Sequence, residues 1–273
     1  MKAVNLLCIF REPECSYHSL VEDRAILRNV GCLLEPCEAK VKYCEAGSPA
    51  IDEISAEFDL VLTMCQSLLM LQKLRKLEHK TLFLNKPSSS LGCHRHTMLK
   101  KLARNDILHP EWSLTPAAKL LSSLGGSIPY WIKRPDVHAE EEMDVVLING
   151  SYQLHPCMQH FLEKKITQVI VQQHLVGRVL KCYAVPSADF FYCAGIVDLS
   201  ERLVTEIKNL VARLGMIFEL AIYGVDIMLT NGEELFVIDV NDWPSFRVCP
   251  DLAARAIAQL VRSTLTALPI TRN

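Results

Sequence analysis

Hydrophobic and polar positions along the first 88 residues follow two different periods. Short apolar runs predict strands, whereas leucines at intervals of three and four residues predict helices. The strands are expected at 3–10, 58–64 and 81–85, and the helices at 19–30 and 66–77. Because strands alternate with helices, the pattern predicts a small parallel sheet. The turn-forming residues at 85–90 predict the end of this domain.

The rest of the chain has a different pattern, in which several strands follow one another through short turns. Strands are expected at 128–133, 143–148, 167–174, 178–185, 219–229 and 234–240, and helices at 95–104, 157–163, 200–214 and 251–265. Asn231-Gly232 separates the last two strands and is a strong signal for a β-hairpin. We therefore expect an α+β architecture here, after an α/β beginning.

Composition narrows the class of protein. The chain has 273 residues, of which 50% are hydrophobic, so it can bury a large core. The formal net charge of −2 favours neither nucleic acid nor an anionic membrane as a partner. The apolar runs are too short to span a bilayer, and the N-terminus lacks the features of a signal peptide. We expect a cytoplasmic protein with no nucleic-acid or membrane partner, and leave its oligomeric state open.

The chain has eleven cysteines, an odd number, and no CxxC pair. Several lie in apolar segments, where cysteine behaves as a small hydrophobic residue, so reduced thiols are favoured over a disulfide framework. The cluster Cys93-His94-Arg95-His96 suggests zinc as an alternative. A structural zinc site needs a second pair of ligands at suitable spacing, and no convincing pair follows.

The hairpin at Asn231-Gly232 carries the most informative polar residues. Asp226 lies in an otherwise apolar strand, and Asp239 and Asn241 are two residues apart in the next strand. Alternate side chains of a strand share one face, and the hairpin can bring Asp226 onto that face. Three oxygen ligands without sulfur or imidazole suit magnesium. The alternative is that these are aspartates on exposed strands facing water.

Two strand lysines are candidates for binding an anion. Lys133 ends an apolar strand, where a buried ammonium needs a negatively charged partner, unless the side chain reaches out to solvent. Lys181 lies in the strand that follows Gln172-Gln173-His174 and a short turn. This strand–turn–strand unit could offer backbone hydrogen bonds to a base and a charge to a phosphate. The sequence contains neither GxxxxGK[ST] nor GxGxxG, which disfavours P-loop and Rossmann nucleotide sites.

In this order and spacing, these elements resemble the ATP-grasp superfamily over residues 85 to 250. The resemblance implies two α+β subdomains that sandwich a nucleotide, at 89–176 and 177–273, preceded by a small parallel α/β domain at 1–88. It also implies ATP with magnesium, or manganese, as cofactors. The implied nucleotide contacts are Arg95, Lys133, Lys181 and the strand end Gln172-Gln173-His174, and the implied metal ligands are Asp226, Asp239 and Asn241.

Two branches of the superfamily are candidates. Carboxylate–amine ligases, such as the ribosomal-protein glutamate ligases, join a small-molecule or peptide acceptor through an acyl phosphate. Inositol trisphosphate kinases of this fold have the aspartate form of the Asp239–Asn241 pair and a histidine after the first lysine, here His138. The chain lacks the dense basic clusters that an inositol polyphosphate requires, so we favour the ligase. Arg247 is a candidate for reaching the acceptor, and His138 for contacting phosphate or for acid–base chemistry.

The sequence departs from both branches at two glycines. Ser245 replaces the glycine that usually follows the proline of the last motif, and the segment 134–143, which usually forms a glycine-containing phosphate loop, has none. A non-catalytic nucleotide-binding module is therefore a further alternative.

Overall fold

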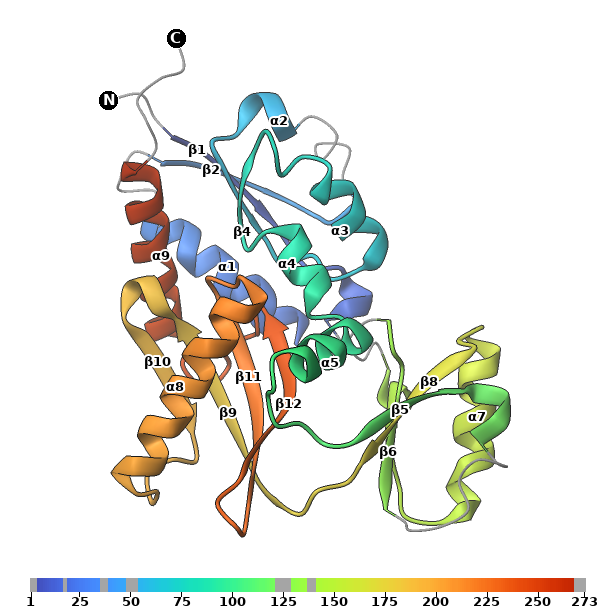
Figure 1. Ribbon diagram of the computed structural model, residues 1–273. Coiled ribbons are helices and arrows are strands. Elements are labelled where there is room, and N and C mark those ends of the chain that lie inside the picture. Colours follow the sequence, from blue (N-terminus) through green and yellow to red (C-terminus); the bar gives the residue numbers. More distant parts are fainter. Residues whose placement is uncertain are drawn as a thin grey trace. The chain divides into compact units, whose positions relative to one another are not determined.

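A computed structural model describes residues 4–16, 19–34, 39–47, 54–120, 129–136 and 141–267, the side chains of 55 and 56 excepted. These residues form two compact units (Figure 1). The first unit combines Met1–Cys93 with Leu180–Val225 and Val240–Asn273, and the second combines His94–Val179 with Asp226–Asp239. The division into three domains predicted from the sequence stays a prediction.

The N-terminal part of the first unit contains the predicted parallel sheet, in the order β2-β1-β3-β4. Its strands are β1 (Val4–Ile9), β2 (Ala39–Cys44), β3 (Leu60–Thr63) and β4 (Leu82–Leu84). The two central strands are mostly apolar because both faces of a parallel sheet are covered. The strands expected at 3–10, 58–64 and 81–85 are therefore confirmed within their described residues.

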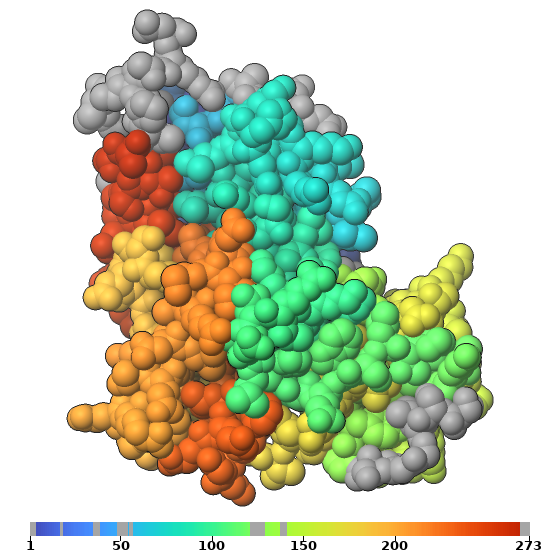
Figure 2. Space-filling view, in the orientation of Figure 1, coloured from blue at the N-terminus to red at the C-terminus, as the bar shows by residue number. Residues whose placement is uncertain are grey.

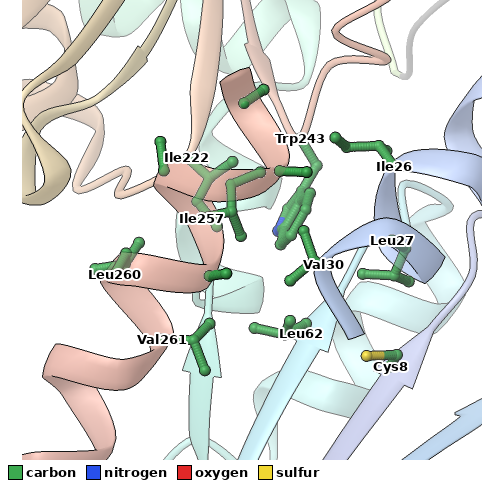
Figure 3. Close-up of a cluster of buried hydrophobic side chains, with 14 of the residues drawn as sticks. Cys8, Ile26, Leu27, Val30, Leu62, Ile222, Trp243, Ile257, Leu260 and Val261 are labelled. Atoms are coloured by element: carbon green, nitrogen blue, oxygen red, sulfur yellow. The ribbon is translucent and has the colours of Figure 1, made fainter. Parts of the chain in front are cut away.

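Helices cover both faces of this sheet. On one face, α1 (Leu20–Leu34) and α9 (Pro250–Thr266) pack against alternate residues of β1 and β3 (Figure 3). On the other face lie α2 (Ile54–Glu57) and α3 (Leu68–Arg75). Trp243, from the segment before α9, is fully buried in the first of these cores. The N-terminal sheet therefore completes its core with residues from the far end of the chain.

Arg11 makes polar contacts both with the N-terminal part of the first unit and with the segment that contains Trp243. Its guanidinium donates to the Asp23 carboxylate at 2.9 Å, to the Met64 carbonyl at 3.3 Å and to the carbonyl of Trp243. The indole nitrogen of Trp243 in turn donates to the Leu84 carbonyl at 2.9 Å. A buried guanidinium is tolerated because its donors find partners.

The segment at 85–90, predicted as a turn-rich boundary, is instead mostly helical. Helix α4 (Pro87–Gly92) starts there, with Pro87 at its first position. Proline is well suited to this position because the first N–H groups of a helix have no partner within it. The prediction of turns was wrong because proline and serine begin a helix here, while the predicted boundary stays a prediction.

The second unit contains an antiparallel sheet in the order β5-β8-β6-β7. Its strands are β5 (Trp112–Pro116), β6 (Tyr130–Lys133), β7 (Val145–Ile148) and β8 (Gln168–Gln173). Helix α7 (Leu154–Glu163) packs on one face through Leu154, Cys157 and Phe161. Helix α5 (Arg95–Arg104) begins and ends at the residues predicted for it.

A third sheet has the order β10-β9-β11-β12. Its strands are β9 (Gly177–Val185), β10 (Phe190–Ala194), β11 (Tyr223–Thr230) and β12 (Leu235–Asp242). The predicted hairpin turn is closed by a hydrogen bond from the Thr230 amide to the Glu234 carbonyl. By their residue ranges, β9, β11 and β12 each pass from one unit into the other.

Helix α8 (Glu201–Phe218) is capped by the preceding residue, Ser200, whose hydroxyl accepts from the Leu203 amide at 3.3 Å. One side of α8 packs against β11, where the Tyr223 hydroxyl donates to the Val211 carbonyl at 3.0 Å. The other side is polar and lies on the surface, in orange in Figure 2.

Short 3-10 turns occur at Pro13–Cys15, Ala117–Lys119, Glu142–Asp144, Ser151–Gln153 and Pro186–Ala188. The ten cysteines within the described ranges form no disulfide bond. Within those ranges, no helix has the length and hydrophobicity needed to cross a membrane.

Candidate functional site

One face of the second unit's sheet carries an unusual set of side chains. The strand register places Gln172 directly opposite Trp112 on one side and Trp131 on the other, so all three share a face. Lys133 lies two residues after Trp131 and points to the same face. The opposite face is the apolar core that packs against α7. The polar and aromatic residues therefore gather on the face that α7 does not cover.

Lys133 is a buried cation on this face, with only 6% of its surface exposed. Its ammonium donates to Oε1 of Gln172 at 2.6 Å and lies 5.7 Å from the centre of the Trp131 ring. Burial, together with the positive charge of Arg95, lowers the pKa of Lys133 to about 8, against the opposing effect of Asp239 and Asp226. An ammonium group has three donors, so Lys133 can also donate to a negatively charged group.

Arg95, the first residue of α5, is a second buried cation. It donates to the backbone carbonyl of Arg134 at 2.7 Å. Burial lowers the pKa of Arg95, and the carboxylate of Asp239 has the largest opposing effect. The charge of Arg95 therefore acts on Lys133, and the carboxylate of Asp239 acts on both cations. Two like charges held together in a buried place are typical of a site for an anion.

The two predicted metal-binding aspartates both lie in the second unit. Asp226 is in β11, Asp239 is in the neighbouring strand β12, and both are half-buried. Both act on the charge of Lys133, so the structure brings them near the same ammonium. Asn241 follows Asp239 by two residues on β12 and belongs to the first unit.

The donor set of Asp226, Asp239 and Asn241 contains only oxygen ligands from two carboxylates and one amide. This composition suits magnesium, which is usually held by one or two carboxylates together with water and phosphate. In the described part of the chain, no three His, Cys, Asp or Glu side chains gather as a site for a metal. The chemistry of the donor set therefore favours magnesium over zinc.

The end of β8 has hydrogen bonds that link it to both neighbouring strands. The amide of Gln173 donates to the Glu111 carbonyl at 2.8 Å, and its side-chain oxygen accepts from the Glu111 amide at 3.3 Å. Nδ1 of His174 accepts from the indole of Trp131 at 3.2 Å. Because indole only donates, this contact assigns the ring proton of neutral His174 to Nε2.

Three predicted site residues do not belong to the described part of the second unit. Lys181, in β9, and Arg247, after β12, are both exposed and belong to the first unit. Arg247 lies near enough to Asp23 to oppose the rise that burial causes in the pKa of that carboxyl, although Arg11 opposes it more. His138 lies outside the described residues.

Ion pairs that we did not predict from the sequence connect the segment after β6 to neighbouring residues. The Arg134 guanidinium donates to the Asp144 carboxylate at 3.1 Å and to the Asp136 carboxylate at 2.9 and 3.0 Å. The His160 ring nitrogen lies 3.1 Å from the other oxygen of Asp144. The one local signal was the proximity of Arg134 to Asp136, which is too common a pattern to predict the network. In the glycine-free segment 134–143, ion pairs thus hold the two described ends.

Solved structures match this chain in fold. No protein-family model matches the sequence, and no curated protein matches it. The D-alanyl-alanine synthetase A of Vibrio cholerae has a TM-score of 0.77 at 16% identity, covering 97% of this chain and 99% of its own. The D-alanine–D-alanine ligase of Bacillus anthracis complexed with ATP has a TM-score of 0.71 at 13% identity, covering 97% and 100%. A RimK-domain ATP-grasp protein of Sphaerobacter thermophilus has a TM-score of 0.68 at 15% identity, covering 93% and 98%.

The chain has the ATP-grasp fold, preceded by a parallel α/β domain. This confirms the fold predicted from the sequence. Identities of 16% and below establish likeness of fold, and the chemistry has to be argued from this chain's own residues.

Proposed function

We propose that this protein is an ATP-grasp enzyme that uses magnesium and ATP, and that it joins a carboxylate to an amine. One observation carries the proposal: Lys133 and Arg95 are both buried cations, and the charge of the half-buried Asp239 acts on both of them. Buried cations of this kind are suited to a polyphosphate, and the carboxylate to a cation that accompanies it.

In the proposed complex, Lys133 and Arg95 contact the phosphates, and the end of β8 contacts the base. Asp226, Asp239 and Asn241 hold magnesium, for which manganese is an alternative. The bound metal ion supplies positive charge that offsets the charge of the phosphates. The burial of Lys133 supports this assignment, because the ammonium there is costly until an anion joins it.

Three further residues complete the proposed site. Lys181 offsets charge as the γ-phosphoryl group moves, Arg247 binds the acceptor, and His138 contacts a phosphate. Transfer of this type depends on positioning and electrostatics more than on a protein nucleophile.

In the ligase reaction, a carboxylate oxygen of a small-molecule or peptide substrate attacks the γ-phosphorus of ATP, and ADP leaves. The resulting acyl phosphate is attacked by an amine, which forms an amide and releases phosphate. The names of two of the matched structures, the D-alanyl-alanine synthetase A and the D-alanine–D-alanine ligase, support the choice of a carboxylate and an amine as substrates.

A second candidate is phosphoryl transfer to an alcohol, as in the inositol phosphate kinases of this fold. The aspartate at position 239 in Ile238-Asp239-Val240-Asn241 favours it. The two reactions have different products, since the ligase releases free phosphate together with its amide and the kinase leaves ADP as the only by-product. Release of phosphate that depends on both a carboxylate and an amine supports the ligase.

The test of the nucleotide site is isothermal titration with ATP, with and without magnesium. We expect binding that magnesium strengthens in the wild type and that is lost in the Asp239→Ala, Asn241→Ala double variant. The exposed Asp251→Ala variant, in the first turn of α9, serves as a matched control and should bind as the wild type does. A folded wild-type protein that binds no nucleotide contradicts the proposal. Binding without turnover over a broad panel of acceptors indicates the non-catalytic module instead.

A further inference from the structure

Cys182 in β9 and Cys193 in β10 lie directly opposite each other across two antiparallel strands. Opposite residues in such strands have Cα atoms about 4.5 or about 5.5 Å apart, depending on their place in the hydrogen-bond pattern. Both spacings fall within the range of about 4.4–6.8 Å that a disulfide bond spans. Opposite side chains also share one face of the sheet. The strand register therefore places these two thiols as a disulfide bond requires.

The two thiols lie on the face of this sheet that α8 covers. Phe191 is two residues before Cys193 and shares its face, and the ammonium of Lys208 in α8 lies 5.7 Å from the centre of the Phe191 ring. The opposite face carries Tyr183 and Tyr192, whose rings are 6.3 Å apart and pack against the core that contains α9. All these residues belong to the first unit.

The two thiols also interact with each other. A hydrogen bond from Cys182 lowers the pKa of Cys193, against burial, which raises it. The thiolate is the form of cysteine that reacts as a nucleophile, so this contact favours reaction at Cys193. Burial raises the pKa of five other described cysteines, which are Cys8, Cys44, Cys65, Cys157 and Cys249.

Cys8 and Cys44 are also neighbours, but they lack this geometry. They lie in adjacent parallel strands and are one residue out of register. Cys8 belongs to the core that contains α1 and α9, whereas Cys44 packs against the core on the other face of the sheet. Side chains that point apart cannot be joined without movement of the backbone. Proximity of two strands is therefore not sufficient, and the shared face distinguishes Cys182 and Cys193.

We propose that Cys182 and Cys193 are a modification site, at which hydrogen peroxide produces a disulfide bond between β9 and β10. Cys193 reacts first, because it lies on an edge strand and has 7% of its surface exposed, against 1% for Cys182. Cys182 then acts as the resolving thiol. The proposal does not depend on the proposed function, since it concerns two thiols within one sheet.

The reaction has two steps. The Cys193 thiolate attacks one oxygen of hydrogen peroxide, the O–O bond breaks, and the departing hydroxide takes up a proton to become water. The sulfenic acid formed on Cys193 is then attacked by the sulfur of Cys182, which forms the S–S bond and releases the second oxygen as water. In total, two thiols lose two electrons and two protons, and one peroxide becomes two molecules of water.

The disulfide bond changes the strand that carries Lys181. Lys181 directly precedes Cys182 and lies opposite Ala194. Opposite residues have Cβ atoms about 4.5–5.5 Å apart, whereas a disulfide bond holds them at about 3.5–4.5 Å. Oxidation therefore draws β9 and β10 together next to Lys181 and fixes the edge strand covalently.

The test is mass spectrometry of the full-length protein after treatment with hydrogen peroxide. Catalase then removes the peroxide, and N-ethylmaleimide in denaturant labels every remaining thiol. Trypsin cleaves after Lys181 and Arg202, and no lysine or arginine lies between them, so one peptide, 182–202, contains both cysteines. We expect this peptide to lose two hydrogen atoms and to carry no label. After reduction with dithiothreitol it should take up two labels.

Variants identify the role of each thiol. In Cys182→Ser, the sulfenic acid on Cys193 has no resolving thiol, so dimedone should label Cys193. In Cys193→Ser, dimedone should leave Cys182 unlabelled. Cys157→Ser is the matched control, since it removes a buried cysteine of the second unit and should leave the disulfide bond intact. The exposed Cys32 should lose its N-ethylmaleimide label in every protein, which shows that the oxidant acted.

Three results overturn the proposal. The first is a wild-type peptide 182–202 that carries two labels although Cys32 has lost its own. The second is a disulfide bond from Cys193 to a cysteine other than Cys182. The third is a bond between Cys182 and Cys193 that forms only when peroxide is added in denaturant, because the folded strands would then not bring the thiols together.

Discussion

Asn85 and Ile222 are joined by two hydrogen bonds that run in opposite directions. The side-chain nitrogen of Asn85 donates to the Ile222 carbonyl at 2.6 Å, and its oxygen accepts from the Ile222 amide at 3.0 Å. The same oxygen accepts from the Ala221 amide at 2.8 Å. One buried side chain thus pairs the backbone at the start of β11 with the end of the N-terminal sheet, within the first unit.

Replacing Asn85 by alanine should destabilise the protein by about 3 kcal/mol, because it leaves two backbone donors and one acceptor without partners. Urea unfolding measures the change. Asn105→Ala, which removes one hydrogen bond to Lys101 in a half-buried place, should cost less than about 1 kcal/mol. An equal decrease in the free energy of unfolding in the two variants would show that the Asn85 hydrogen bonds contribute no more than the single Asn105 hydrogen bond.

Gly177 is expected to tolerate no side chain. A Cβ atom there would lie 2.3 Å from the carbonyl oxygen of Leu229. Because that atom is backbone, Gly177→Ala should shift β9 away from β11 and cost about 2 kcal/mol. Gly232→Ala, in the hairpin turn, meets no atom closer than 3.9 Å and should change stability by less than about 0.5 kcal/mol. Thermal unfolding of both variants distinguishes them, and similar melting temperatures would rule out the close approach.

Nucleotide affinity should fall as the pH rises through about 8. Burial lowers the pKa of Lys133 to about 8, from an ordinary 10.5, so the free protein loses this charge in that range. Phosphate binds the charged form, and binding therefore requires uptake of a proton at higher pH. Titrations in buffers with different ionisation enthalpies measure that uptake.

Lys133→Arg is the matching control, since a guanidinium stays charged throughout this range and should give a flat pH profile. A sloping profile in the variant assigns the dependence to another group. The sign for folding follows from the same lowered pKa. Because the folded state prefers the neutral amine, the free energy of unfolding is highest above pH 10.5. It decreases as the pH falls from 10.5 towards 8, where the folded protein must bury the charged form.

The buried pair Arg11–Asp23 should matter far more than the exposed pair Arg24–Glu45. Arg11→Ala leaves the Asp23 carboxylate buried without its main cation and should cost about 4 kcal/mol. Arg24→Ala disrupts a bidentate contact on the surface and should cost less than about 1 kcal/mol. Denaturant unfolding at neutral pH compares the two variants.

The cost of Arg11→Ala should shrink in acid. Burial already raises the pKa of Asp23, and removing Arg11 raises it further, so the variant takes up a proton as the pH falls through that pKa. The protonated carboxyl is less costly to bury. A loss of stability that stays constant from neutral pH to pH 4 would contradict this account.

The strands that the sequence failed to predict share one property, since each lies at the edge of its sheet. They are β2, β5 and β10. β2 reads Ala-Lys-Val-Lys-Tyr-Cys, with lysines at alternate positions, and β5 ends in Pro116. Edge strands often carry charge or proline, and their pairing is set by the neighbouring strand more than by their own hydrophobicity. The central strands β1, β3 and β8 are more apolar and were predicted.

The candidate site was predictable residue by residue but not as an arrangement. Lys133 was identifiable as a cation in an apolar strand, and Asp226 as an acid in another. The contact between Lys133 and Gln172 depends on the register of β6 against β8, 39 residues apart, for which no local pattern gives a signal. The burial of Arg95 likewise depends on neighbours that lie far away in the sequence.

The burial of Trp243 and α9 in the core of the N-terminal sheet has a consequence for the order of folding during synthesis. The ribosome synthesises β1 and β3 early, whereas α9, which covers their apolar face, is synthesised last among the helices. This face therefore stays partly bare while most of the chain leaves the ribosome, and chaperones have a long interval in which to hold it. Removing α9 should consequently leave a nascent N-terminal domain that does not mature, rather than a shortened but folded protein.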